Sequence, residues 1–154
     1  MTAKADFTEE EWNLVREGPP AAGVLVLMAQ GGGSFRETWA LAKSYTEARK
    51  QPGQSQLLDE LASEKPDVER YPTREEQERH ALTGLREAIA VLEQKATPEE
   101  VEGYRTFVLD VARKVAEAHE EEGEPISAAE QAAIEKVASS IRTPQGPVST
   151  DTRE

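Results

Sequence analysis

The stretch TPEEVEGYRTFVLDVARKVAEAHEEEGEPISAAEQAAIEKVASSI, residues 97–141, reads as a long helix, an acidic turn and a shorter helix. Thr97-Pro98-Glu99-Glu100 is a helix start: Thr97 can cap the first N–H groups, Pro98 has its φ preset, and Glu100 can close a capping box. Apolar side chains then recur at steps of three and four, and Phe107 broadens their stripe. This pattern predicts a helix ending near His119, with a buried face of Val101, Tyr104, Val108, Val111, Val115 and Ala118.

The predicted helix meets Glu120-Glu121-Glu122-Gly123-Glu124-Pro125, where Gly and Pro disfavour continuation. A second capping box, Ser127 to Glu130, opens the next helix, and its apolar face is Ala133, Ile134, Val137, Ala138 and Ile141. No Lys or Arg lies between Lys114 and Lys136. Seven glutamates do, at positions 117, 120, 121, 122, 124, 130 and 135, so negative charge is concentrated here.

This helix–turn–helix stretch resembles the signature of tellurite-resistance TerB-like domains. The resemblance rests on Val115-Ala116-Glu117-Ala118, Gly123, Ile126-Ser127 and Glu130, and spans residues 97–141. Where that family has Asp directly before Gly, this chain has Glu122, and its turn is longer. The resemblance implies an all-helical fold, a stress-related role and a divalent cation near the turn.

The acidic turn is the candidate metal site. Ca²⁺ and Mg²⁺ take several oxygen ligands, which carboxylates supply. The candidate ligands are Glu120, Glu121, Glu122, Glu124 and Glu130. The spacing does not match an EF-hand, because with Glu130 at position twelve the Gly falls at position five and His119 takes the first ligand position. The alternative is a solvated acidic turn in which Glu130 only caps its helix.

Upstream, Thr8 to Glu11 forms a third capping box, and Gly18-Pro19-Pro20 predicts the end of a short first helix. Pro20 is then expected to open a second helix over residues 20–29, which is apolar on nearly every side and therefore central. A strand remains the alternative for that run. Helix is favoured because no partner strand is visible elsewhere.

Two more capping boxes lie at Ser34–Glu37 and Thr73–Glu76, and Leu57 to Leu61 predicts a short helix between them. The helix that begins at Thr73 ends near Lys95, only two residues before the next one. Such a short connection predicts an antiparallel hairpin. Residues 143–154 read as a disordered tail, which leaves residues 1–142 as one all-α bundle of about six helices.

Composition limits the function. The net charge of −12 disfavours a nucleic-acid surface and an anionic membrane, because phosphate would be repelled. The chain has no cysteine, and its two histidines, His80 and His119, lack a glutamate three residues earlier. No basic targeting segment or span of about 20 apolar residues is visible, so a cytoplasmic location is expected.

These observations predict a non-enzymatic module that binds a protein partner of basic character, with a divalent cation as the TerB-like resemblance implies. The alternative is a helical interaction module without metal. An enzyme with an acidic site ranks third, because no nucleophile–base arrangement is visible.

Overall fold

The computed structural model describes residues 2–29, 42–48, 50, 55–64, 71–121 and 127–142, with residues 119–121 as backbone. Every regular element in these ranges is helical, which confirms the all-α prediction. A 3₁₀ turn, η1, precedes the α-helices, and residues 42–48 are helical as well. The bounds are η1 Lys4–Asp6, α1 Glu9–Ala29, α3 Gln56–Ala62, α4 Arg74–Lys95, α5 Pro98–Glu121 and α6 Ala128–Ser140.

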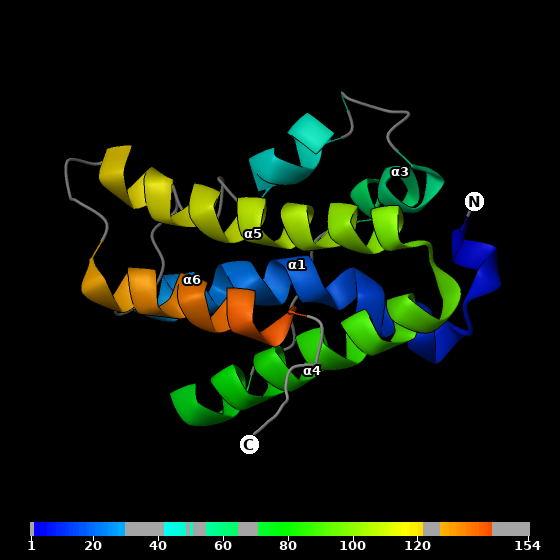
Figure 1. Ribbon diagram of the computed structural model, residues 1–154. Coiled ribbons are helices and arrows are strands. Elements are labelled where there is room, and N and C mark those ends of the chain that lie inside the picture. The colour runs from blue at the N-terminus through cyan, green and yellow to red at the C-terminus, as the bar shows by residue number, and fades with distance from the viewer. Residues whose placement is uncertain are drawn as a thin grey trace, which may run out of the picture.

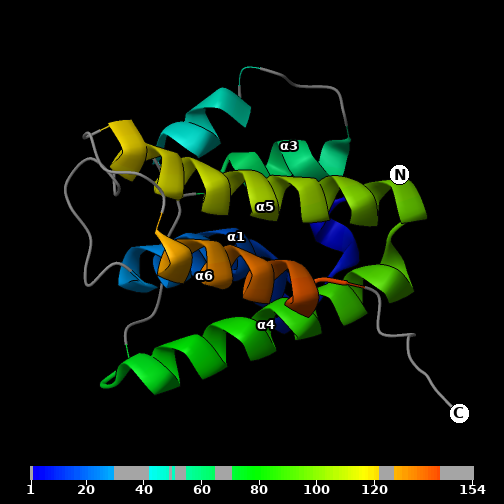
Figure 2. The same cartoon turned by 60° about the vertical axis from the view of Figure 1, so that its left-hand side comes forward.

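Helix α1 is the centre of the bundle (Figure 1). It packs along α4 on one side and along α5 on the other, and α6 runs beside it. Residues 42–48 and α3 lie on the outer side of α5, away from α1 (Figure 2). The prediction that residues 20–29 are central and helical is confirmed, and the strand alternative is wrong.

The predicted break at Gly18-Pro19-Pro20 is wrong, because α1 runs unbroken through both prolines. In a regular helix the Val15 carbonyl would accept a hydrogen bond from the N–H of residue 19, but Pro19 has no N–H. The buried Tyr104 hydroxyl of α5 donates a hydrogen bond to this carbonyl, at 2.7 Å. Gly18 makes room for that hydroxyl, since a Cβ there would lie 2.2 Å from it. A contact from another helix thus replaces the backbone donor that is missing at Pro19.

Helices α4 and α5 form the predicted antiparallel pair, joined by Ala96 and Thr97. They do not pack against each other along their whole length. The two helices come close mainly near their turn, and α1 fills the space between the rest of them (Figures 1 and 2). Leu85 of α4 and Val108 of α5 are both fully buried. A Cβ at Gly18 would touch Leu85 of α4 as well as Tyr104 of α5, which places α1 between them.

The helix starts follow the sequence signals. Both bonds of the capping box form at Thr8–Glu11, Thr97–Glu100 and Ser127–Glu130, and the Thr73 hydroxyl accepts from the Glu76 N–H. Glu100 also accepts hydrogen bonds from the backbone N–H and the hydroxyl of Thr2, at 2.9 and 2.7 Å. Burial raises the pKa of Glu100, but these hydrogen bonds lower it by more, so the net pKa lies below 4.5.

The predicted Ser34–Glu37 box and the predicted tail at 143–154 lie outside the described residues. Within the described parts of the chain, no helix combines the length and the apolar character needed to cross a bilayer.

Candidate functional site

The predicted metal site is described in part only. Glu122 and Glu124 lie outside the described residues, and the side chains of Glu120 and Glu121 do as well. Glu130 is fully buried, and its carboxylate accepts the Ser127 N–H at 2.8 Å. This is the capping role that the sequence gives as the alternative to metal ligation. Elsewhere in the described ranges, no three His, Asp or Glu side chains converge as a metal site requires. The cation at the acidic turn therefore stays a prediction.

The structure instead shows a groove on the outer side of α5, where residues 42–48 and α3 lie over that helix. Its volume is about 340 Å³, within the range of about 300–1,000 Å³ typical of ligand pockets. We call it the α5 groove. Its lining residues are Ser44, Glu47 and Ala48 from the 42–48 helix, Leu58 and Asp59 from α3, and Gly103, Thr106, Phe107, Asp110 and Lys114 from α5.

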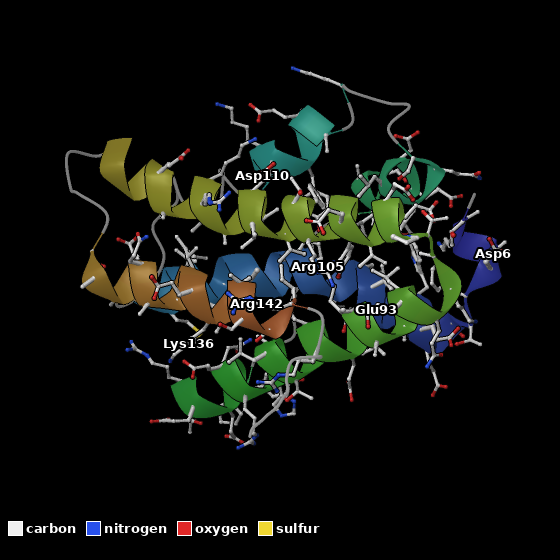
Figure 3. The ribbon with its side chains drawn as sticks, in the orientation of Figure 1. Asp6, Glu93, Arg105, Asp110, Lys136 and Arg142 are labelled. Carbon is white, nitrogen blue, oxygen red and sulfur yellow. The ribbon has the colours of Figure 1, made fainter. Side chains whose placement is uncertain are left out.

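The α5 contribution comes from one helical face. Positions 103, 106, 107, 110 and 114 follow the spacing of three and four residues that brings side chains together on a helix. Figure 3 shows Asp110 on the side of α5 that the 42–48 helix covers, and Arg105 on the opposite side. The Arg105 Nε donates to the Ile141 carbonyl at the end of α6. One face of α5 therefore packs into the bundle, and the opposite face lines the groove.

The floor of the groove is apolar. The half-buried Phe107 ring meets the buried Tyr45 ring edge-on, with centroids 5.2 Å apart. Leu58 packs over Gly103, because a Cβ at Gly103 would lie 3.1 Å from the Leu58 Cδ1. The absence of a side chain at Gly103 thus brings α3 close to α5 and leaves Leu58 and Phe107 beside the same opening.

Acidic and basic groups surround this floor. Among the described residues that line the groove, three carry a carboxylate, Glu47, Asp59 and Asp110, and one carries an ammonium group, Lys114. Lys114 forms an ion pair and hydrogen bond with Glu47 across the groove. This hydrogen bond, together with the positive charges of Lys114, Lys43 and Lys50, lowers the pKa of Glu47 below its ordinary value of 4.5. Glu47 is therefore ionised at neutral pH. Among the described lining residues carboxylates outnumber ammonium groups three to one, and the positive charges of Lys43 and Lys50 also act on Glu47.

Sequence reasoning missed this groove. It assigned Phe107 to the edge of the core stripe and gave Asp110 and Lys114 no role. The available signal was an aromatic residue, an acid and a base at steps of three and four on the polar side of α5. That signal cannot identify the segments that cover it, because residues 44–48 and 58–59 are distant along the chain.

Among the described residues that line the groove, the polar groups are the carboxylates, the Lys114 ammonium and the hydroxyls of Ser44 and Thr106. Such a lining is suited to binding a cationic, partly apolar group. Comparisons with protein-family models, with curated proteins and with solved structures found no match to this chain.

Proposed function

We propose that this protein is a non-enzymatic helical module that binds a basic segment of a protein partner in the α5 groove. The observation that carries the proposal is the combination of an apolar floor with an excess of carboxylates around it. Leu58 and Phe107 offer contacts to an apolar side chain, while the exposed Asp110 attracts positive charge. A segment that carries Lys or Arg next to an apolar residue matches both features.

The charge of the whole protein acts in the same direction. A net charge of −12 attracts basic partners over long range and speeds their association. It repels phosphate, so an acidic groove is poorly suited to nucleic acid. The volume of about 340 Å³ is at the low end of the pocket range, which suits a few side chains of a segment and not a large embedded helix.

The stress-related role and the divalent cation that the TerB-like resemblance implies stay predictions, as does the cytoplasmic location. Helices α5 and α6 form before and after the acidic stretch, as the sequence predicts.

Peptide binding measured by fluorescence anisotropy tests the proposal. The probe is a labelled short peptide of alternating Lys and Leu. One control peptide has Glu in place of Lys, and another has Ser in place of Leu. We expect the Lys–Leu peptide to bind more tightly than both controls, because only it satisfies the charged rim and the apolar floor.

Two charge-reversal variants distinguish the effect of the groove on peptide binding from the effect of the protein's net charge. Asp110→Lys changes a groove residue, and Glu87→Lys makes the same change on an exposed position of α4. Asp110→Lys should weaken binding by roughly tenfold, and Glu87→Lys by no more than about threefold, because charges beyond a Debye length are screened. Equal weakening by both variants would show that net charge alone attracts the peptide, and the groove assignment would fall.

A further inference from the structure

The ion pair between Lys114 and Glu47 crosses the α5 groove. It joins α5 to the 42–48 helix, and both side chains line the cavity. Their exposed fractions are 37% and 42%, so an incoming group can reach either one. Among the described residues that line the groove, Lys114 is the one cation. The groove of the free protein thus already has one of its carboxylates paired with a cation of the same chain.

We propose that Lys114 occupies the place of a partner's cationic side chain at Glu47, and that an arginine of the partner displaces it. This inference rests on the proposed function and specifies the chemistry of the partner. An exposed Lys–Glu pair is worth little in free energy, so exchanging it for another pair is feasible. Lys114 remains tethered to α5 and can turn to solvent when it leaves.

Arginine is the side chain that gains most from this exchange. Its planar guanidinium can give two parallel hydrogen bonds to one carboxylate, whereas an ammonium group acts as a point charge. A partner lysine would replace Lys114 at Glu47 with no gain in bonding. The site therefore selects Arg over Lys at one position of the bound segment, while the Leu58 and Phe107 floor accepts the apolar neighbour.

The test compares an Arg–Leu peptide with the Lys–Leu peptide on three proteins: wild type, Lys114→Met and Glu47→Gln. Methionine keeps an unbranched apolar side chain but removes the competing charge. Lys114→Met should bind the Arg–Leu peptide about two- to fivefold more tightly than wild type, the factor that corresponds to one exposed ion pair. Glu47→Gln should remove the preference for Arg over Lys, because it removes the carboxylate that the guanidinium recognises.

The outcomes separate this inference from the proposed function. If the basic peptides bind and Asp110→Lys weakens them, but Lys114→Met binds no better than wild type, the displacement is wrong and the groove function stands. Weaker binding by Lys114→Met would mean that Lys114 contacts the partner directly, which also overturns displacement. Failure of any basic peptide to bind overturns both. A circular dichroism melt of each variant confirms that it is folded, which we expect because surface ion pairs contribute little to stability.

Discussion

The hydrogen bond between Tyr104 and Val15 is expected to stabilise α1 where Pro19 interrupts its backbone hydrogen bonds. Val15 is fully buried, and its carbonyl accepts the Tyr104 hydroxyl at 2.7 Å. Burial raises the pKa of Tyr104 well above its ordinary value of 10.0, so the phenol keeps the proton that it donates. Tyr104→Phe removes the donor and leaves a buried acceptor unsatisfied, which costs about 1–3 kcal/mol. For a domain of this size, each kcal/mol lowers the melting temperature by about 2–4 °C.

A double-mutant cycle makes this prediction specific. Pro19→Ala restores the N–H that can bond the Val15 carbonyl within α1. Tyr104→Phe should therefore cost about 0.5 kcal/mol or less in the Pro19→Ala background, against about 1–3 kcal/mol in the wild type. Urea unfolding followed by circular dichroism measures all four free energies, with the slope m as a check on two-state behaviour. An equal cost in both backgrounds would refute the claim that Tyr104 replaces the donor missing at Pro19.

The remaining predictions concern two glycines, acid stability and the acidic turn. Gly84→Ala should raise the free energy of unfolding by about 0.5–1 kcal/mol, because alanine favours the helix and nothing lies within 4 Å of a Cβ there. Gly18→Ala should lower the free energy of unfolding, since its Cβ would lie 2.2 Å from the Tyr104 hydroxyl oxygen. Tyr104→Phe, which removes that oxygen, should make the Gly18→Ala change less destabilising. Stabilisation by both alanine substitutions would contradict the packing around Gly18. The pKa values of Glu64 and Glu100 lie below 4.5, because burial raises them but hydrogen bonds lower them by more. The stability that these two groups contribute is therefore present above pH 4.5 and is lost as the pH falls through their folded-state pKa values. Urea titrations at a series of pH values check this, and a stability that rises on acidification would have the wrong sign. If a divalent ion binds at the acidic turn, a free ion concentration of 100 times its Kd should raise the free energy of unfolding by about 2.7 kcal/mol more than NaCl does at matched ionic strength. Glu130→Gln should remove this gain. A melting temperature no higher than with NaCl would reject the site.

Helix starts and buried faces could be predicted from sequence because their causes are local. The capping box at Thr97 and Glu100 depends on residues three apart, and both of its bonds form. The apolar spacing from Val101 to Ala118 is likewise a property of one helix, and each of its predicted core positions is buried.

The path of α1 could not be predicted, because its cause is tertiary. Read locally, Gly18-Pro19-Pro20 is a stop signal. The donor that compensates for Pro19 is the hydroxyl of Tyr104, which lies 89 positions along the chain from its acceptor, Val15. The same residues that suggest a break are, in the fold, the place where α1 fits between Leu85 and Tyr104.

The candidate site was hidden for a similar reason. The α5 groove needs three segments that only the fold brings together, and neither Asp110 nor Leu58 has a distinctive local pattern. The acidic turn is conspicuous in the sequence because four of its glutamates lie within five residues, 120–124. Contiguous charge indicates a solvated segment as readily as a site, and the described member, Glu130, is occupied with capping.

Chemical-shift mapping by nuclear magnetic resonance tests the central claim, that the α5 groove binds a basic segment, most directly. The ¹⁵N-labelled protein is titrated with the Lys–Leu peptide, at an ionic strength near physiological so that weak surface attraction is screened. If the peptide binds in the α5 groove, we expect saturable shifts at the amides of Ser44, Leu58, Gly103, Phe107 and Asp110, and no change at the amides of α4 around Glu87. Shifts spread over all acidic surfaces, or centred away from α5 and α3, would contradict it.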